Sequence, residues 1–311
     1  MVTGGAGFIG SHLVERLLED GHQVICYDNL DDWYSGKRKN IARRLESPEF
    51  EVKENSILDI DALRSALEDV EVVFHEAAQP GIPVSVKNPL KTFTVNVNGT
   101  LNVLLASLDA GVRKVVYASS SSVYGNGVPR PTNEDCETRP ISPYGISKLV
   151  TEGLCRAIGE MHGLRIVAMR YFTVFGPRQR PDMAIRKFAD LMSSGKPAVI
   201  FGDGEQTRDF TFISDVVDAN ILAMESSSAD GEMINIGRGN SITVNEVVAK
   251  LREHLPDAPE PTYEAAKKED VDHTLADNSK AGRLLGWQPK VPFDDGLRTF
   301  VDWYLSEEAR P

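Results

Sequence analysis

Residues 1–10 are MVTGGAGFIG, with glycines at positions 4, 7 and 10. A turn from a strand into a helix needs glycine where the backbone approaches a pyrophosphate, because a Cβ would obstruct the approach. The helix that begins near Phe8 would direct its N–H groups and its positive dipole end at the phosphates. Only three residues precede the turn, so we expect a first strand shorter than the usual five or so. The stretch predicts a nucleotide-binding α/β fold, with a merely tight turn as the alternative.

Apolar strands alternate with longer helical patterns through the first half of the chain, which predicts a parallel sheet with crossover helices. The expected strands are 24–27, 72–75, 115–118 and 165–172. Apolar residues recur at helical spacing at Val97, Leu101, Leu104, Leu105 and Leu108, and again at Ile146, Val150, Leu154, Ala157 and Met161. After about residue 172, glycine and proline divide the chain into shorter elements. We therefore predict a cofactor domain over 1–170, with a return strand near 233–237, and a smaller α/β substrate domain over 171–311.

The second predicted strand ends at Asp28, which lies 18 residues beyond Gly10. A carboxylate at this place can accept hydrogen bonds from both ribose hydroxyls of NAD and would repel a 2′-phosphate. The alternative is an aspartate that only closes a turn. Lys37 and Arg38 could admit NADP, but we expect them to lie too far along the chain to override Asp28, so NAD is the predicted cofactor. Asp59 and Ile60 follow the third strand pattern and are expected beside the adenine.

Tyr144 and Lys148 form a YxxxK pair, which places both side chains on one face of a helix. The Lys148 ammonium and the positive nicotinamide should depress the phenol pKa, so that the phenolate can act as a general base. A run of four serines, 119–122, follows a predicted strand. Hydroxyls at the carboxyl end of a parallel strand face the ligand crevice. Together these residues predict hydride-transfer chemistry.

Composition excludes several other classes. The net charge of −12 argues against a nucleic-acid partner, and we interpret it as a solvated acidic surface. No run approaches the roughly 20 apolar residues that cross a bilayer, so we expect no membrane partner. The six histidines lack metal-ligand spacing, so no metal site is predicted. The three cysteines form no CxxC pair, which favours a cytoplasmic location.

The whole chain resembles the nucleotide-sugar epimerase branch of the extended short-chain dehydrogenase/reductase family. The matching stretches are TGGAGFIGSH, HEAAQPG, NVNGTLNVL, SSSSVYG, YGISK, RYFTVFGPRQRPDMA, DGEQTRDFTFISD and LADNSKAGRLLGW. The resemblance implies a Rossmann-type domain that retains NAD and a smaller carboxyl-terminal domain that holds a nucleoside diphosphate. It assigns Ser120 as the catalytic serine beside Tyr144 and Lys148. The expected cofactor contacts are Gly4, Gly7, Phe8, Ile9, Gly10, Asp28, Asn29, Asp59, Ile60, Ala77, Ala78, Asn96, Tyr144 and Lys148.

The implied reaction inverts C4 of a UDP-sugar. Tyr144 removes the 4-hydroxyl proton while NAD takes the hydride, the 4-keto sugar turns over in the pocket, and the hydride returns to its other face. Ser120 bonds the 4-oxygen. Ser121 and Ser122 stand where dehydratases of the family carry an Asp-Glu pair and, at Ser122, where decarboxylases carry Glu. We therefore expect epimerisation, with both serines facing the substrate.

The sugar is less clearly specified. Thr173 and Arg180 resemble the residues of UDP-glucuronate 4-epimerases that pair with the sugar carboxylate. A surface ion pair of Arg180 is the alternative, and Pro83 replaces an arginine that those enzymes often carry. We favour UDP-glucuronate slightly over UDP-glucose or UDP-galactose.

Arg208 matches the family's diphosphate-binding arginine, with a local Arg208–Asp209 pair as the alternative. Lys267 and Asp270 stand in place of the family's RPGD motif, so Lys267 would act as a point charge without the fork of an arginine. In relatives, the helices around 91–110 and after Pro143 pack against their copies. A homodimer is expected on that ground, although apolar stripes facing the sheet are equally expected.

Two other functions remain open. A nucleotide-sugar reductase or dehydrogenase would produce a net change in NADH. A non-catalytic NAD-binding paralogue would be favoured by loss of Tyr144 or Lys148, and both are present.

Overall fold

The computed structural model describes residues 1–34, 36–266 and 271–306. Within these residues a seven-stranded sheet has the order β10-β6-β5-β4-β1-β2-β3, and every neighbouring pair is parallel. Its strands are β1 (Val2–Thr3), β2 (Val24–Asp28), β3 (Phe50–Glu54), β4 (Val72–His75), β5 (Lys114–Ser120), β6 (Arg165–Tyr171) and β10 (Met233–Ile236). The strand order reverses between β1 and β4, which is where open α/β sheets bind ligands. The predicted doubly wound parallel sheet is confirmed.

The first strand is short, as its sequence indicates. β1 has two residues, yet it pairs with both β2 and β4 and so lies in the interior of the sheet, next to its central strand β4. At the other end, β10 pairs in parallel with β6, so the expected return strand joins the sheet. The boundary between two domains at residues 170 and 171 stays a prediction.

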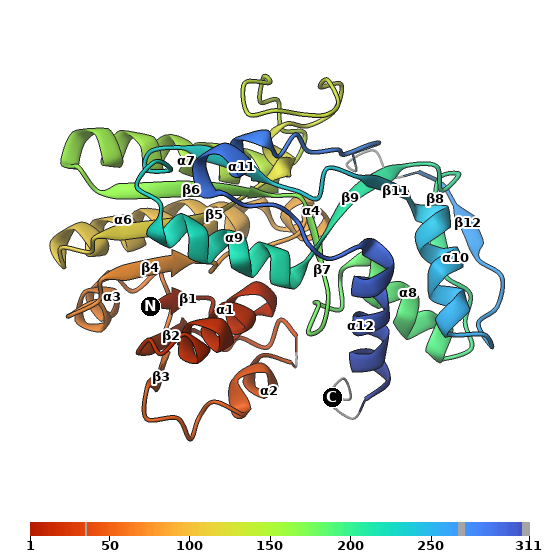
Figure 1. The fold of residues 1–311 in the computed structure, drawn as a ribbon, viewed down its shortest axis with the longest axis horizontal. Coiled ribbons are helices and arrows are strands. Elements are labelled where there is room, and N and C mark those ends of the chain that lie inside the picture. Colours follow the sequence, from red (N-terminus) through yellow and green to blue (C-terminus); the bar gives the residue numbers. More distant parts are fainter. Residues whose placement is uncertain (35, 267–270, 307–311) are drawn as a thin grey trace.

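Helices cover both faces of this sheet (Figure 1). One face carries α3 (Ile60–Ala66), α6 (Gly99–Asp109) and α7 (Pro143–His162), and the other carries α1 (Phe8–Glu19) and α9 (Ile213–Glu225). Further elements are α2 (Lys37–Ala42), α4 (Ile82–Lys87), α5 (Pro89–Phe93), the π-helical η1 (Thr94–Asn98), the 3₁₀ turn η2 (Ser121–Val123) and α11 (Ser279–Leu285). A separate apolar core fills each side of the sheet. None of the helices in the described residues is both long and apolar enough to cross a bilayer.

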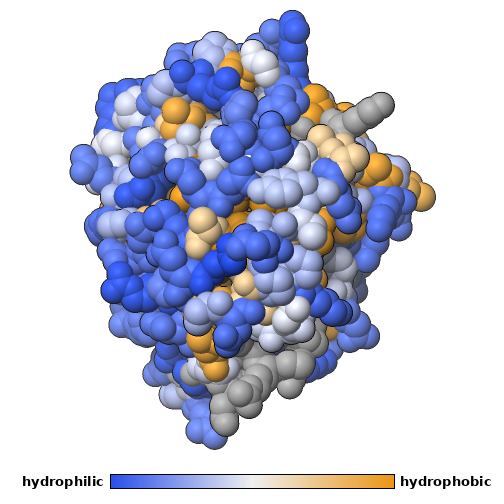
Figure 2. All heavy atoms as spheres, turned by 90° about the vertical axis from the view of Figure 1, so that its right-hand side faces the viewer, coloured by the Kyte–Doolittle hydropathy of each residue, from blue (hydrophilic) through white to orange (hydrophobic). Residues whose placement is uncertain are grey.

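A smaller group of elements lies to the right in Figure 1. It contains β7 (Thr173–Phe175), β8 (Val199–Phe201), β9 (Thr207–Phe212), β11 (Ser241–Thr243), β12 (Thr262–Glu264), α8 (Ala184–Ser193), α10 (Val244–His254) and α12 (Phe293–Leu305). Phe175 contacts Phe210, Phe212 and Phe293 in its core. The face that this group presents is predominantly hydrophilic, with apolar residues in small separate patches (Figure 2).

Local signals fix helix α7, which carries two of the predicted catalytic residues. The Ser142 hydroxyl caps its first turn by accepting from the Gly145 N–H at 3.1 Å, and Pro143 occupies the first helical position. Gly163 ends the helix in the left-handed conformation, with φ 74°. The buried face of α7 includes Lys148. Most of the apolar stripe that begins at Ile146 faces outward instead of toward the sheet.

Candidate active site

A cavity of about 680 Å³ lies at the carboxyl ends of the sheet strands. Its volume is in the usual range for small-molecule and cofactor sites, about 300–1,000 Å³. The glycine turn, the ends of β2, β4 and β5, and the start of α7 all contribute to its wall. Twelve of the predicted site residues line it: Gly4, Gly7, Phe8, Ile9, Gly10, Asp28, Asn29, Ala77, Ala78, Tyr144, Lys148 and Arg180.

The glycine turn connects β1 to α1 with little space for side chains. Gly4 adopts φ +68°, and a Cβ at Gly10 would overlap the Gly4 carbonyl oxygen. The backbone of the turn can therefore approach a ligand, and the first N–H groups of α1 face the cavity from Phe8 onward. This arrangement fits the diphosphate of a dinucleotide.

Asp28 closes β2 at the cavity wall, as the sequence predicts. Its carboxylate accepts from the N–H groups of Ala6, at 3.2 Å, and Leu30, at 2.9 Å. Lys37 lies closer to Asp28 than its place in the sequence indicates, because its ammonium is 3.4 Å from Asp28 Oδ1. The closer partner of Lys37 is Asp31, at 2.6 Å, so two carboxylates compensate its charge.

The residues predicted beside the adenine are placed differently. Asp59 is the N-cap of α3 and accepts from the Ala62 N–H at 3.0 Å, and Ile60 is the first residue of that helix. The cavity wall at this point consists of the residues just before them, 55–58. Aspartate is common both as a helix N-cap and as a ligand contact at the end of a strand. The sequence alone therefore did not show which of these roles Asp59 has.

Asn96 is buried one step behind the cavity wall. Its amide accepts from the Gln79 N–H at 2.7 Å and donates to the Gln79 carbonyl oxygen at 3.2 Å and to Ser147 Oγ at 2.9 Å. Asn96 was predicted to bind the cofactor. In the structure it holds the segment after β4, which includes Ala77 and Ala78, against α7.

Tyr144 and Lys148 lie on the same side of α7, with the Lys148 ammonium 5.9 Å from the Tyr144 ring centroid. The ammonium donates to the Ala118 carbonyl oxygen at 2.6 Å, and burial lowers the Lys148 pKa to about 8. Burial raises the Tyr144 pKa, against the opposing effects of Arg180 and of a hydrogen bond with Ser120. The expected depression of the Tyr144 pKa involves the positive nicotinamide together with Lys148, and it stays a prediction.

The serine run turns sharply at the end of β5. Ser120 Oγ accepts from the Ser122 N–H at 3.2 Å and lies 3.1 Å from Ser122 Oγ. A Cβ at Gly145 would meet the Ser122 carbonyl oxygen at 2.5 Å, so α7 approaches the turn as closely as glycine allows. Ser121 and Ser122 are half-buried in η2. Of the predicted catalytic trio, Tyr144 and Lys148 line the cavity, while Ser120 lies next to Tyr144 where β5 and α7 meet and is not part of the cavity wall.

Arg180 lines the same cavity as Tyr144. Its guanidinium makes a two-point ion pair with Asp182, at 3.0 and 3.1 Å, and lies over the Trp33 ring at 5.2 Å. The ion pair that the sequence allowed as an alternative is present, but it lies at the cavity and not on the outer surface. Thr173 begins β7 and is half-buried.

The predicted nucleotide-binding residues lie in the smaller group of elements. The Arg208 guanidinium donates to the backbone oxygens of Thr207, at 3.0 Å, and Asp272, at 3.2 Å. The neighbouring Asp209 carboxylate accepts from the backbone N–H groups of Arg238, Gly239 and Ala276. Lys267 and Asp270 lie outside the described residues.

Sequence reasoning missed Glu76 and Tyr171, which also line the cavity. The Tyr171 hydroxyl is 2.7 Å from Glu76 Oε1, and burial raises the Glu76 pKa to about 7. One signal was available, because a charged residue directly after an apolar strand such as β4 calls for an explanation. Their contact was not predictable, since it joins residues 95 positions apart.

A buried ion pair connects the elements that carry the predicted catalytic residues. Arg170 on β6 bonds both carboxylate oxygens of Glu152 on α7, at 2.9 and 2.8 Å. Glu152 also accepts from Ser119 Oγ at 2.6 Å, and Arg170 donates to the Tyr124 hydroxyl at 2.8 Å. The pair therefore ties α7 to β5 and β6, the elements that carry the trio.

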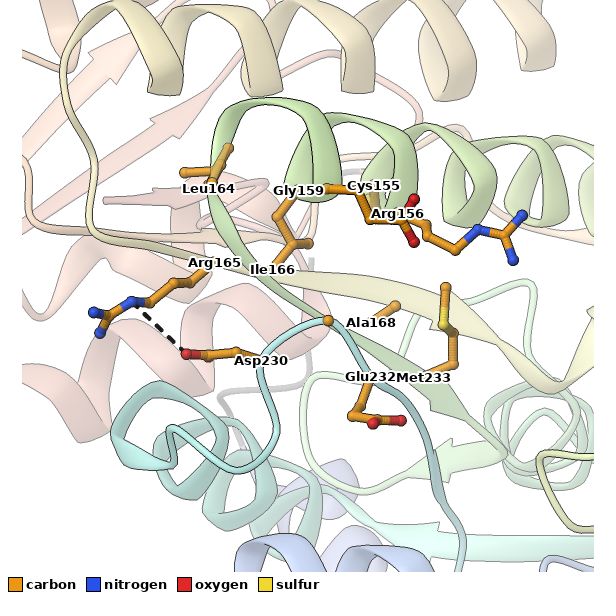
Figure 3. Close-up of a pocket in the computed structure, with 13 residues that line it drawn as sticks. Cys155, Arg156, Gly159, Leu164, Arg165, Ile166, Ala168, Asp230, Glu232 and Met233 are labelled. Atoms are coloured by element: carbon orange, nitrogen blue, oxygen red, sulfur yellow. Dashed lines mark ion pairs between the residues drawn. The ribbon is translucent and has the colours of Figure 1, made fainter.

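A second cavity, of about 290 Å³, lies at the opposite, amino-terminal ends of β6 and β10 (Figure 3). Arg165 and Asp230 form an ion pair at its wall, with N and O 3.8 Å apart. Burial raises the pKa of the adjoining Cys155 thiol to about 12, which makes it a poor nucleophile. No predicted site residue lines this cavity, so the larger one is the candidate active site.

Comparisons with known proteins agree with this geometry. The sequence model of the NAD dependent epimerase/dehydratase family matches residues 1–237. A UDP-glucuronate 4-epimerase from Thermodesulfobacterium geofontis is 38% identical, over 97% of this chain and 95% of that protein. The structure is similar to a UDP-glucose 4-epimerase of Thermotoga maritima with UDP-glucose (40% identity, TM-score 0.91, 97% of both chains). It is also similar to a UDP-glucuronic acid 4-epimerase of Bacillus cereus with UDP-glucuronic acid and NAD (37% identity, TM-score 0.93, 97% of both chains).

Proposed function

The chain belongs to the NAD-dependent epimerase/dehydratase family, and we propose that it is a UDP-sugar 4-epimerase with a slight preference for UDP-glucuronate. The observation that carries the proposal is the meeting of Tyr144, Lys148 and Arg180 in one cavity that also includes the glycine turn. The cavity therefore brings together a residue that can transfer a proton (Tyr144), the glycine turn that can hold the cofactor, and a cation that can bind the sugar (Arg180).

The residues present fit NAD. The glycine turn leaves room for a diphosphate beside the first N–H groups of α1, and Asp28 offers a carboxylate at the end of the next strand. When bound, NAD supplies the group that accepts a hydride from C4 of the sugar and can return it to the same carbon. Because nothing is consumed in that cycle, the cofactor stays with the enzyme.

Tyr144 acts as the general base that removes the proton of the sugar 4-hydroxyl. Ser120, which is hydrogen-bonded to the phenol, holds the 4-oxygen and relays its proton. Lys148 is fixed by the Ala118 carbonyl oxygen, so its charge stays close to the phenolate as that anion forms. On the return step, Tyr144 gives the proton back to the 4-oxygen.

The neighbours of Ser120 support epimerisation over the other reactions of the family. Dehydratases of the family need an acid and a base directly after this serine, and the decarboxylases use a glutamate at the second place. Ser121 and Ser122 are alcohols that do not titrate near neutral pH. The 4-keto sugar is then left with one outcome, which is reduction.

Arg180 supports the uronate preference. A guanidinium can hold the sugar carboxylate through two parallel hydrogen bonds, which a neutral hexose cannot offer. In the structure this fork is occupied by Asp182, so a uronate would have to compete with or join that pair. The preference is therefore slight.

The direct experiment incubates the purified protein separately with UDP-glucose, UDP-N-acetylglucosamine and UDP-glucuronate, resolves the 4-epimers and follows absorbance from NADH. We expect 4-epimers without net NADH formation, and the highest kcat/KM with UDP-glucuronate. Net formation or consumption of NADH would instead identify a reductase or dehydrogenase. Absence of any epimer would contradict the proposal.

We also propose a homodimer formed by α4, α5, α6 and α7. Large apolar side chains are exposed on these helices: Val86, Leu105, Ile146, Val150 and Met161. Met161 is 74% exposed and Val86 is 49% exposed, which is unusual for apolar residues on neighbouring helices. Because the α7 stripe does not pack on the sheet, a second copy of the chain is a suitable cover.

A cytoplasmic location completes the proposal. Cys26, Cys136 and Cys155 are all free thiols. Burial raises the pKa of Cys26 and Cys155 to about 12, so neither is poised for disulfide exchange. Free cysteines are typical of reducing compartments.

A further inference from the structure

Glu76 places a carboxyl group inside the candidate active site. It follows His75 directly after β4, and its side chain forms part of the cavity wall with Tyr144, Lys148 and Tyr171. None of the reaction steps described above uses it. Glu76 is half-buried. A carboxylate that is partly removed from water is costly unless it is paired or carries a proton, so the protonation state of Glu76 needs a physical explanation.

The hydrogen bonds around Tyr171 decide that state. The Tyr171 hydroxyl is 2.7 Å from Glu76 Oε1 and 2.9 Å from Asn220 Oδ1. The orientation of the Asn220 amide is fixed because its Nδ2 donates to the Val216 carbonyl oxygen at 2.9 Å. A phenol has one proton, whereas an amide oxygen and a carboxylate can only accept. Both contacts are hydrogen bonds only if Glu76 carries a proton and donates it to Tyr171.

The charged and titratable groups around Glu76 are consistent with a protonated carboxyl. Burial raises the Glu76 pKa to about 7, against the smaller effects of Tyr171 on β6 and Lys148 on α7. On β4 itself, His75 is neutral, because burial lowers its pKa to about 3. From α7, Tyr144 also faces Glu76, and a negative Glu76 raises the Tyr144 pKa.

We propose that Glu76 works as a carboxylic acid: protonated, it donates to Tyr171 and keeps the cavity free of a negative charge beside Tyr144, and ionised, it suppresses formation of the Tyr144 phenolate. The proton moves between Glu76 and solvent, so no other reactant is needed. The second half of the proposal rests on the proposed epimerase function, while the first half does not. Glu76 thereby tunes the general base without touching the reacting atoms.

Glu76→Gln is the discriminating variant, because an amide can donate to Tyr171 as the acid does but cannot ionise. Glu76→Leu, which removes the donor, is its matched control. An ionised Glu76 also raises the Lys148 pKa, so the Gln variant loses the Lys148 proton at a lower pH than the wild type does. That shift would lower the activity of the variant at high pH, which is opposite in sign to the effect expected through Tyr144. The readout is the ratio of kcat in Glu76→Gln to kcat in the wild type across pH. We expect a ratio near one below pH 6 that rises to about fivefold at pH 9, the effect of one charge at moderate distance. A ratio that does not change with pH would overturn the suppression of the phenolate.

Two further measurements test the proton without relying on activity. An infrared difference spectrum between the wild type and Glu76→Gln at pH 6 should contain the carbonyl band of a protonated carboxyl group. In the unfolded chain, the carboxyl group of a glutamate has a pKa of about 4.3. Because the folded pKa is higher, the wild type binds the extra proton below neutral pH and loses stability as pH rises through 7.

The difference in Tm between Glu76→Gln and the wild type should therefore grow from pH 5 to pH 8. A constant difference, or no carbonyl band, would overturn the protonated carboxyl even in an active epimerase. If the protein epimerises no UDP-sugar, these two measurements still decide the state of Glu76. Failure of the inference and failure of the proposed function are thus distinguishable.

Discussion

The Lys148 ammonium lies 5.9 Å from the centroid of the Tyr144 ring and donates its hydrogen bond at 2.6 Å to the carbonyl oxygen of Ala118. The two side chains are one helical turn apart, as their spacing predicts, but the lysine is anchored to β5. Its charge is therefore fixed in place before any ligand binds. Within this pair, Lys148 contributes a fixed positive charge and Tyr144 is the residue that exchanges a proton.

Asp28 should determine the choice between NAD and NADP. We expect Asp28→Ala to weaken NAD binding by about 10- to 100-fold, because it loses charge-assisted bonds to the ribose. It should also raise the relative affinity for NADP, since the repulsion of a 2′-phosphate is removed. The two dissociation constants can be measured by calorimetry.

Asp28→Asn is the conservative control, because its amide oxygen can still accept from one of the two N–H groups, those of Ala6 and Leu30, that Asp28 binds through separate oxygens. Lys37→Met tests the nearby lysine, and it should leave the preference for NAD unchanged. An Asp28→Ala protein that folds normally and binds NAD as the wild type does would contradict the assignment.

Arg180 should set the preference between charged and neutral sugars. Arg180→Met is expected to lower kcat/KM for UDP-glucuronate about 10- to 100-fold more than for UDP-glucose, because only the uronate loses a charge-assisted contact. The comparison uses the ratio of the two substrates, since Arg180 also lowers the Tyr144 pKa for both.

Asp182→Asn is the matched variant, which frees the Arg180 fork from its carboxylate partner. We expect it to lower KM for UDP-glucuronate and to leave KM for UDP-glucose within about threefold. Equal losses on both sugars in Arg180→Met would contradict a role in recognising the carboxylate.

The Glu152–Arg170 pair should be a main support of the fold around the site. Glu152→Gln leaves the Arg170 guanidinium in the interior without its charge partner, so we expect a loss of about 3–5 kcal/mol and a clearly lower Tm. The double variant Glu152→Gln with Arg170→Met removes the stranded charge and should recover part of the loss. A Tm within a degree of the wild type in Glu152→Gln would show that the pair contributes little.

The exposed stripe of α7 should drive dimer formation. Val150→Glu places a charge in the middle of the stripe and should shift the protein from dimer to monomer in sedimentation velocity experiments. Leu45→Glu is the control, since Leu45 is 58% exposed and lies after α2, away from this face. A monomeric wild type at micromolar concentration would rule out the dimer.

Much of the fold was predictable because its signals are local. The glycine turn, the apolar strands and the capped start of α7 depend on residues within a few positions of one another. The return strand was recognisable as a short apolar run, and it pairs with β6. The YxxxK spacing likewise placed Tyr144 and Lys148 on one side of α7 before any tertiary contact was known.

The features that the sequence did not yield depend on contacts between distant elements. Whether the Ile146 stripe faces the sheet or solvent depends on which side of α7 packs inward. The buried side of α7 is largely polar, so the rule that apolar residues face the core predicts the wrong side. Lys37 reaches Asp28 only because the loop after β2 folds back. The contact between Glu76 and Tyr171 depends on the pairing of β4, β5 and β6.

The most direct test of transient oxidation at C4 is epimerisation in D₂O, with the products examined by NMR. If hydride leaves and returns through the bound NAD, both 4-epimers form with ordinary hydrogen still on C4. Tyr144→Phe should lower this turnover by about 100- to 10,000-fold, the usual range for a general base, while NAD stays bound. Deuterium at C4, or full activity of Tyr144→Phe, would contradict the account.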